Sequence, residues 1–502
     1  MNINRTDVYV VSVALVRALA LTACTKDTPI DASPEMTTGD DSSGGDQSGG
    51  DDDHTTSPTP TGNRGGGKLD GGTLDAGNLN GGKVEVGNAD AGKVDASKGN
   101  VGKVDAGKPV ASTTADGGSS TVSGGTTGDG GRGAAVTSPE PSVVAGCGSA
   151  KLYQVDDEDT GRLGPWPVGV KTLKVPVDSG ALTVEVWYPA AYASNAGKTK
   201  EAYDLRDWLP TGAAMVPDSM NRLDVCECYR DLPLDSTHGP YPVMLYIHGL
   251  GSMRVASLTT MALWASRGFI VVAADHPGDM LTDFLASFGA LEGCSSPTPA
   301  GGDMASEANS VLAAFKAKQA GFDFFGDRAD LTRLALGGHS QGGGTVAGMA
   351  GTPGVKVIIT LAPLGGGALN APVDSMLQVT GTIDSVTGYS TAAYTSDRSP
   401  VRRHVGINQA GHLDMTDLCK EKNSDGKTAI DVLRDQSICG ALILSTLAQC
   451  GGDAAATEVA PLIVNYATTA ALEETLHCQN RDAAFRALQT KYPHASEFLH
   501  TP

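Results

Sequence analysis

Apolar residues are distributed very unevenly along this chain. Between Thr25 and Gly146 there is no Phe, Tyr or Trp, and Gly, Asp, Ser, Thr and Lys dominate the stretch. Such a segment cannot bury enough apolar surface to offset the entropy lost on ordering. Nearly all the aromatic side chains and long apolar runs follow it. We therefore expect a disordered linker over residues 24–146 and a folded domain over residues 147–502.

In the folded part, short apolar runs of strand type alternate with segments of helical periodicity. Val243–Ile247 and Phe269–Ala274 are continuous apolar runs, as expected for strands buried on both faces of a sheet. Ala305–Gln319 places Val311 and Phe315 on one helical face. This alternation predicts an α/β fold with a mostly parallel sheet covered by helices on both faces. The other elements expected are a helix at Leu258–Ser266 and strands at Val168–Val175, Leu182–Tyr188, Leu334–Leu336, Val355–Ala362, Met376–Thr380 and Arg403–Ile407.

The linker contains an internal repeat. Between Gly66 and Asp105 a five-residue pattern recurs as GGKLD, GGTLD, AGNLN, GGKVE, VGNAD, AGKVD, ASKGN and VGKVD. Its apolar fourth position could stack as a small pentapeptide β-helix, but so few repeats without aromatic caps favour a flexible stalk.

The N-terminus has the pattern of an export signal. Val8–Ala20 is mostly apolar and too short to span a membrane. The following Leu21-Thr22-Ala23-Cys24 resembles a bacterial lipoprotein lipobox, which implies a signal peptide over residues 1–23 and a lipid on Cys24. We expect an exported protein anchored to the bacterial outer membrane or cell surface, with an ordinary cleaved signal as the alternative.

Net charge and cysteine content exclude some classes of ligand and indicate disulfides. The formal net charge of −20 argues against nucleic acid, because a phosphate backbone requires a basic surface. The chain has 9 Cys, and removing Cys24 leaves 9 − 1 = 8, which in an exported chain suggests disulfides of unknown pairing. Cys226 and Cys228 form a CxC rather than a CxxC pair, so no metal site is expected. The helix-rich tail over residues 415–502 also contains Cys, and we expect it to be a stapled cap or buttress.

The motif Gly338-His339-Ser340-Gln341-Gly342 lies between a predicted strand and a helix. This is the context of a G-x-S-x-G nucleophile elbow, in which Ser sits on a sharp turn and the flanking Gly residues avoid collision. The helix N-terminus also favours a developing anion. Ser340 is therefore the candidate nucleophile.

A Ser hydroxyl needs a general base, and in this arrangement an acid and then a His follow it along the chain. Asp384 lies just beyond the predicted strand Met376–Thr380, and His412 lies on the loop after the last predicted strand. We expect Asp384 to orient His412, and His412 to activate Ser340. Other candidates are less well placed: His404 lies inside a strand, His339 should point away from the turn, Asp414 is too close to His412 in sequence, and Asp374 precedes its strand.

A tetrahedral intermediate also needs N–H donors for its oxyanion. One should be the backbone N–H of Gln341, which follows the nucleophile. The second should come from His248-Gly249-Leu250-Gly251, directly after the strand Val243–Ile247, with Leu250 as the donor.

These motifs resemble known families. The set HGLG, Asp275-His276-Pro277-Gly278 and GHSQGGG, with the N-terminal strands, resembles the dienelactone hydrolase-like and platelet-activating-factor acetylhydrolase-like bacterial esterases of the α/β-hydrolase fold. GHSQGGG, Ile383-Asp384-Ser385-Val386 and the segment leading to His412 resemble bacterial cutinases and polyester hydrolases. The resemblance spans roughly residues 163–414 and implies a Ser340, Asp384 and His412 triad, ester substrates and no cofactor. The insertion around residues 204–234 departs from the compact cutinase plan and could shape or cover the pocket.

The sequence therefore predicts a serine carboxylesterase that acts on a small ester, a lipid or a polyester, with short to medium acyl groups. A phospholipid acetylhydrolase-like esterase or a lipase is the alternative within the enzymes. An alternative of another class is a surface lipoprotein that binds its ligand on an inactive hydrolase scaffold.

Overall fold

The computed structural model describes residues 142–143, 151–152, 159–178, 180–210, 222–223, 226–289, 292, 302–420, 422–423 and 425–501. The expected signal peptide, Cys24 and the repeats at residues 66–105 lie outside the described residues. Among those that are described, no helix is long and apolar enough to cross a membrane.

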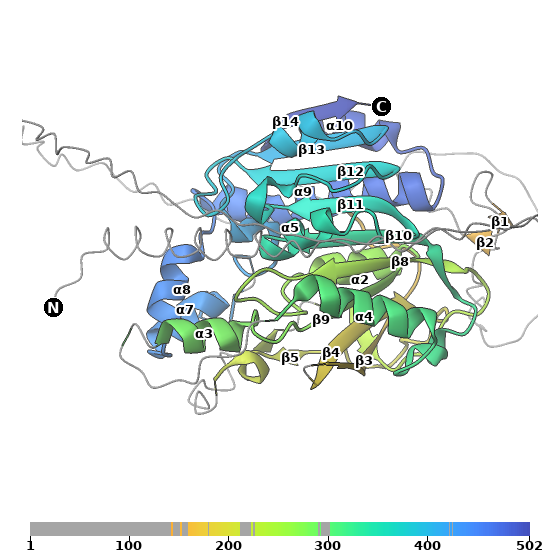
Figure 1. Cartoon of the computed structure of the whole chain (residues 1–502), viewed down its shortest axis with the longest axis horizontal. Coiled ribbons are helices and arrows are strands. Elements are labelled where there is room, and N and C mark those ends of the chain that lie inside the picture. Colours follow the sequence, from red (N-terminus) through yellow and green to blue (C-terminus); the bar gives the residue numbers. More distant parts are fainter. Residues whose placement is uncertain are drawn as a thin grey trace, which may run out of the picture. The chain divides into compact units, whose positions relative to one another are not determined.

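A twisted sheet of ten strands forms the centre of the fold (Figure 1). Its order is β14-β13-β12-β11-β10-β8-β9-β4-β3-β7, and neighbouring strands from β13 to β9 are all parallel. β4 is antiparallel to both β9 and β3, and β14 is antiparallel to β13. The strands are β3 (Val168–Val177), β4 (Gly180–Pro189), β7 (Cys228–Arg230), β8 (Tyr241–Ile247), β9 (Ile270–Ala274), β10 (Ala329–His339), β11 (Val355–Leu361), β12 (Ser375–Gly381), β13 (Val401–Ile407) and β14 (Ala495–Thr501).

Two further pairs of two-residue strands lie outside this sheet. β1 (Ser142–Val143) pairs with β2 (Lys151–Leu152), and β5 (Tyr203–Asp204) pairs with β6 (Arg222–Leu223).

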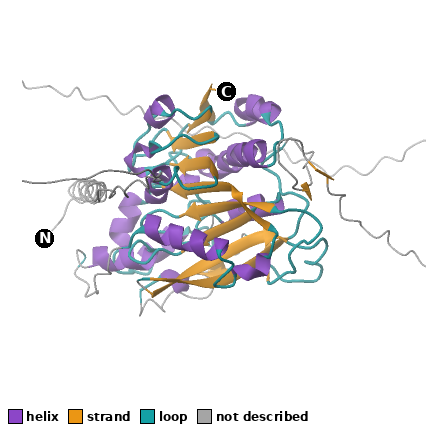
Figure 2. Ribbon diagram, turned by 45° about the vertical axis from the view of Figure 1, so that its right-hand side comes forward, coloured by secondary structure: helices purple, strands orange, loops and turns teal. Residues whose placement is uncertain are grey.

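Helices cover both faces of the sheet (Figure 2). α2 and α9 pack on one face, and α4, α5 and α6 pack on the other. α3, α7 and α8 gather beside the sheet, beyond the carboxyl ends of its central strands (Figure 1). The helices are α2 (Leu258–Ser266), α3 (Leu281–Gly289), α4 (Met304–Lys316), α5 (Gln341–Gly348), α6 (Ala392–Ser396), α7 (Ala429–Asp435), α8 (Ala441–Leu447), α9 (Ala454–Leu476) and α10 (Asp482–Lys491).

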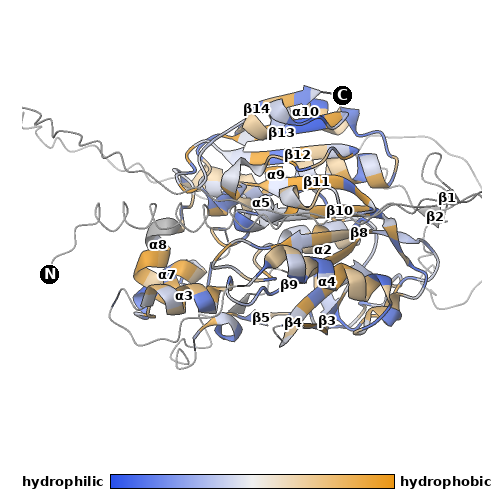
Figure 3. Ribbon diagram, viewed as in Figure 1, coloured by the Kyte–Doolittle hydropathy of each residue, from blue (hydrophilic) through white to orange (hydrophobic). Residues whose placement is uncertain are grey.

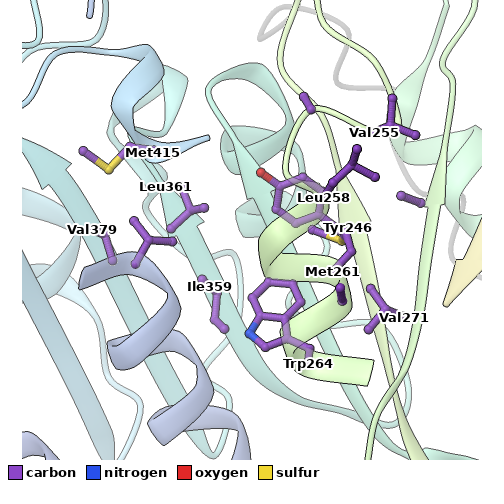
Figure 4. Close-up of a cluster of buried hydrophobic side chains, with 14 of the residues drawn as sticks. Tyr246, Val255, Leu258, Met261, Trp264, Val271, Ile359, Leu361, Val379 and Met415 are labelled. Carbon is purple, nitrogen blue, oxygen red and sulfur yellow. The ribbon is translucent and has the colours of Figure 1, made fainter. Parts of the chain in front are cut away.

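The central strands are buried on both faces because each face contributes to a different hydrophobic core. Along β8, Met244 and Tyr246 belong to the core beneath α2 and α9, whereas the alternating Val243, Leu245 and Ile247 belong to the core beneath α4. This is the period of two that a pleated strand imposes on its side chains. Figure 4 shows part of the first core, where Trp264 of α2 packs between Ile359 of β11 and Val271 of β9.

The predicted elements agree well with this architecture, with differences mainly at their ends. β10 begins at Ala329, five residues before the predicted start at Leu334, because its early part pairs with the start of β8. The strand β14 in the C-terminal tail was not expected. It follows α10 and pairs antiparallel with β13, so it becomes an outer strand of the sheet.

The tail serves as both a buttress and a cap. α9 contributes buried residues along most of its length and lies against β10 to β13, so it completes the core. α7 and α8 lie in a segment closed by a disulfide between Cys419 and Cys450, whose Cα atoms are 5.7 Å apart. We call residues 419–450 the cap.

The remaining cysteines of the described residues are also oxidised. Cys226 and Cys228 are bonded to each other across one intervening residue. Cys439 and Cys478 are disulfide-bonded as well. Disulfides, as expected from the cysteine count, are therefore present in the described part of the chain, and the CxC pair is one of them.

A buried ion-pair cluster joins α9 to the rest of the domain. Glu473 of α9 is fully buried, and its carboxylate accepts from Arg267 at 2.6 Å and from Arg481 at 2.7 Å. Arg267 also donates to the backbone carbonyl of Arg162 at 2.7 Å. The cluster thus connects the start of the domain, the end of α2 and the tail.

We predict that Glu473→Ala lowers the free energy of unfolding by about 3–5 kcal/mol, because it leaves buried guanidinium groups without their carboxylate. Glu458→Ala, at an exposed position of the same helix, should change it by less than about 0.5 kcal/mol. Urea unfolding of both variants measures the difference. Equal effects would contradict a structural role for the cluster.

Candidate active site

Ser340 lies at the turn between β10 and α5, in a backbone conformation that side-chain-bearing residues seldom adopt. Its φ is 55° and its ψ is −118°. A Cβ at Gly338 would lie 2.4 Å from the carbonyl oxygen of Gly342, and a Cβ at Gly342 would lie 2.2 Å from that of Ile247. Both positions therefore require glycine, because the turn brings backbone against backbone there. The sequence folds here into the nucleophile elbow that the motif predicted.

The structure brings the three predicted side chains into one hydrogen-bonded chain. Ser340 Oγ lies 2.9 Å from His412 Nε2, and His412 Nδ1 lies 2.9 Å from Asp384 Oδ2. Asp384 follows β12 and His412 follows β13, so both loops leave the carboxyl edge of the sheet near Ser340. All three residues are buried.

Asp384 is held as an anion. Burial alone would raise the pKa of its carboxyl, but hydrogen bonds from His412 and Thr387 outweigh burial and hold that pKa well below its usual range. The carboxylate accepts from the backbone N–H of Val386 at 2.8 Å and from the hydroxyl of Thr387 at 2.7 Å. An anionic Asp384 favours the tautomer of His412 with its proton on Nδ1, which leaves Nε2 free to accept the Ser340 proton.

The two expected oxyanion donors lie on segments that approach Ser340. Gln341 is the first residue of α5, and Leu250 lies on the loop after β8. A Cβ at Gly249 would lie 3.0 Å from Ser340 Cβ, so this loop passes very close to the nucleophile. Within the described residues, neither the Leu250 nor the Gln341 amide donates to a protein acceptor. Both N–H groups are therefore available to a ligand.

Asp279 forms hydrogen bonds to both of these segments. No motif in the sequence predicts this role. Its backbone carbonyl accepts from Gly251 N at 2.9 Å, and its Oδ1 accepts from Gln341 Nε2 at 3.1 Å. Burial raises the pKa of Asp279 to about 6, although the hydrogen bond from Gln341 opposes the shift.

His248 stabilises the start of the same loop. Its Nδ1 donates to the carbonyl of Gly249 at 2.8 Å, and its Nε2 accepts from the backbone N–H of His276 at 3.2 Å. Burial lowers the pKa of His248 to about 4, so the ring is neutral in the tautomer that these two contacts require. The HGLG and DHPG motifs of the sequence therefore meet in space.

His339 does not point away from the site, contrary to the expectation from the elbow. Its Nε2 donates to the backbone carbonyl of His412 at 3.0 Å, and the two rings are 4.7 Å apart. Burial and the neighbouring His412 lower the pKa of His339 to about 3. The neutral ring therefore supports the His412 loop. The motif alone does not indicate this contact between the residue before Ser340 and the His412 loop.

The other residues weighed against the triad have structural contacts. His404 is buried in β13 and its Nε2 lies 2.8 Å from the hydroxyl of Thr380. Asp414 accepts from the backbone N–H of Gly411 at 2.6 Å and so supports the loop from within. Asp374 pairs with Lys356 at the amino end of β12, which is the end of the strand opposite the one that Asp384 follows.

The tail supplies a further support that no local sequence signal indicates. Gln449 Oε1 accepts from the Ser385 amide at 2.8 Å and from the Ser385 hydroxyl at 3.0 Å. Its backbone carbonyl accepts from Leu413 N at 2.9 Å. Gln449 thus joins the loop of Asp384 to the loop of His412, and the next residue is Cys450 of the cap disulfide.

An apolar pocket opens beside Ser340 and His412. Leu205, from the insertion at residues 204–234, lines it, so the insertion does shape the pocket as the sequence suggested. The other walls come from the loop after β8, from α3 and from the cap, and include Leu250, Met253, Phe284, Ile430, Leu433 and Leu444.

One group of possible metal ligands lies close together among the described residues, namely Asp414, Cys419 and Cys450. The two sulfur atoms are bonded to each other, so neither is a thiolate ligand.

We predict that His339→Gln makes stability less sensitive to acid. The pKa of His339 falls from about 6.5 in the unfolded chain to about 3 in the fold, so the unfolded chain binds the proton first. The stability that this neutral ring contributes is complete above about pH 6.5 and is lost as the pH falls toward about 3. Gln keeps an N–H donor without titrating.

Urea unfolding across this pH window should therefore show a shallower loss of stability in the variant than in the parent protein. Asp279 and Glu307, whose pKa values burial raises, contribute with the opposite sign and equally in both proteins. Parallel profiles would contradict the assignment of a neutral His339.

Comparisons with known proteins find a partial family match and similar solved structures. Residues 160–282 match the family described as platelet-activating factor acetylhydrolase, isoform II, a stretch that includes the HGLG loop and ends before Ser340. A ferulic acid esterase from Streptomyces cinnamoneus is similar in structure, at 17% identity and a TM-score of 0.44, over 67% of this chain and 96% of that chain. No curated protein matches the chain. The mostly parallel sheet, covered by helices on both faces, confirms the predicted α/β-hydrolase fold.

Proposed function

We propose that this protein is a serine carboxylesterase that forms an acyl-enzyme on Ser340. The observation that carries the proposal is the continuous hydrogen-bonded chain from Ser340 through His412 to an anionic Asp384, at the edge of an apolar pocket. A Ser hydroxyl alone is a weak nucleophile, and this chain supplies the base and its orienting group.

In the first half of the proposed reaction, Ser340 Oγ attacks the ester carbonyl carbon while His412 Nε2 takes the hydroxyl proton. The carbonyl oxygen becomes an oxyanion, which the Leu250 and Gln341 amides stabilise. The tetrahedral intermediate collapses when the bond to the alcohol oxygen breaks. The alcohol leaves with the proton from His412, and the acyl group stays on Ser340.

In the second half, water attacks the acyl-enzyme while His412 Nε2 takes a proton from it. A second oxyanion forms in the same place, and Ser340 leaves with the proton returned by His412. The carboxylic acid is released and the enzyme is restored. Asp384 stays ionised throughout and stabilises the charged imidazole of each step.

Two alternatives remain beside this proposal. The family match over residues 160–282 favours a phospholipid esterase or lipase as the second candidate. A purely binding lipoprotein has less support, because a binding site has no need for an ordered Ser, His and Asp chain or for two free amides beside it.

We also propose that the protein is exported and that Cys24 carries a lipid. The lipobox-like Leu21-Thr22-Ala23-Cys24 supports the proposal. The disulfides of the described residues are compatible with it, because disulfides persist in oxidising compartments outside the cytosol.

We predict that Ser340→Ala lowers kcat for p-nitrophenyl butyrate at least about a thousandfold, because the nucleophile is gone. The matched control is Ser310→Ala, in which the lost hydroxyl bonded only within α4. The control should retain parental activity, and circular dichroism should show both variants folded. Substantial hydrolysis by folded Ser340→Ala would contradict the mechanism.

We predict that Gln449→Ala lowers kcat about tenfold with KM changed less than about twofold, because the loops of Asp384 and His412 lose their shared support. Gln449→Glu retains the acceptor oxygen and should recover most of kcat. Its added negative charge near Asp384 favours the charged imidazole of His412 and should therefore shift the acidic midpoint of the pH–kcat profile upward. A merely destabilising role would lower the activity of both variants in parallel with their melting temperatures and would leave the pH profile unchanged.

A further inference from the structure

We propose that the pocket beside Ser340 binds an unsubstituted aliphatic acyl chain, and that the cap determines how long a chain is accepted. The inference rests on the proposed function and names the substrate class of the same site: esters of medium-length fatty acids. It is carried by the composition of the pocket walls and by the way in which the cap is fixed.

The pocket is almost free of polar side chains. Apart from His339, Ser340 and His412, the only polar side chain among its described lining residues belongs to Ser252. Aliphatic side chains dominate the rest, and Phe284 is the one aromatic ring outside the two His side chains. A buried surface of this kind favours methylene groups, because their transfer from water is favourable in free energy and they need no hydrogen-bond partner.

The same composition disfavours polar acyl groups. A phenolic hydroxyl, a methoxyl or a charged group carried into the pocket would lose its water and find few partners, which carries a penalty. An acetyl group would leave most of the apolar surface unused. By contrast, each methylene buried against the walls should raise kcat/KM by up to about fourfold, until the chain meets the cap.

The cap forms one wall of this pocket and is held in place by two kinds of contact. Figure 3 shows apolar residues concentrated on α7 and α8, and of these Ile430, Leu433 and Leu444 line the pocket. The disulfide closes the ends of the segment. Glu292 accepts from the backbone N–H of Gly440 at 2.9 Å, which fixes the start of α8 beside α3.

Ala448, just after α8, offers a direct test of this arrangement. Its small side chain lines the pocket and is only partly buried. A larger side chain at this position would project into space that a long acyl chain would occupy, while Ser340 and the amides beside it stay unchanged. Leu442 of α8 is 57% exposed and is not among the residues that line the pocket, so it is the matched control.

The experiment measures kcat/KM of the full chain for p-nitrophenyl esters from acetate to palmitate, together with methyl ferulate. The parent protein should prefer a medium chain such as octanoate over acetate by more than about tenfold and should hydrolyse methyl ferulate poorly. Ala448→Phe should lower kcat/KM for octanoate more than about tenfold and for acetate less than about threefold. Leu442→Phe should leave the profile unchanged.

Labelling with a fluorophosphonate separates this proposal from the proposed function. Labelling of Ser340 together with a flat or acetate-preferring profile would overturn the aliphatic acyl site and leave the esterase mechanism standing. An equal loss on all esters in Ala448→Phe, or a higher rate on methyl ferulate than on octanoate, would also overturn it. Absence of both labelling and hydrolysis in the folded protein would overturn the proposed function itself.

Discussion

The strained turn at Ser340 is the constraint on which the rest of the site depends. A residue with φ of 55° between β10 and α5 presents its side chain away from the sheet, and this geometry persists only where the surrounding backbone fits tightly. Gly338 and Gly342 permit that fit, and the carbonyl of Ile247 lies where a side chain at residue 342 would be. The same contact brings the loop after β8 against the nucleophile. The positions of Ser340, the Gln341 amide and the Leu250 loop are therefore consequences of one packing arrangement.

Around this turn, side chains from segments distant in sequence form hydrogen bonds that hold the loops of the site in place. Asp279 contacts both segments that carry the free amides, His339 supports the His412 loop, and Gln449 joins that loop to the one carrying Asp384. Burial keeps His339 neutral, so it acts as a fixed donor rather than as a competing base. The cap that lines the pocket also contains Gln449, so one disulfide-closed segment contributes both to the pocket wall and to the support of the loops carrying Asp384 and His412.

Much of this could be predicted from the sequence, because the relevant signals are local. Continuous apolar runs identified the central strands, and the GxSxG spacing located the turn. Chain order after Ser340 then selected Asp384 and His412, which the structure brings within hydrogen-bonding distance. The parts that could not be predicted depend on contacts between distant segments. The orientation of His339, the contacts of Gln449, the pairing of the cysteines and the added strand β14 arise from how the tail packs, and no periodicity or motif encodes that packing.

The most direct test of the central claim is to observe the acyl group on Ser340. During turnover of an activated p-nitrophenyl ester, the parent protein should carry the acyl group on Ser340 until water removes it. Intact-mass measurement after rapid quenching, followed by peptide mapping, would locate it. The account predicts one added acyl group on the peptide containing Ser340, and none in the Ser340→Ala variant. An acyl group on another residue, or hydrolysis at the parental rate by folded Ser340→Ala, would contradict it.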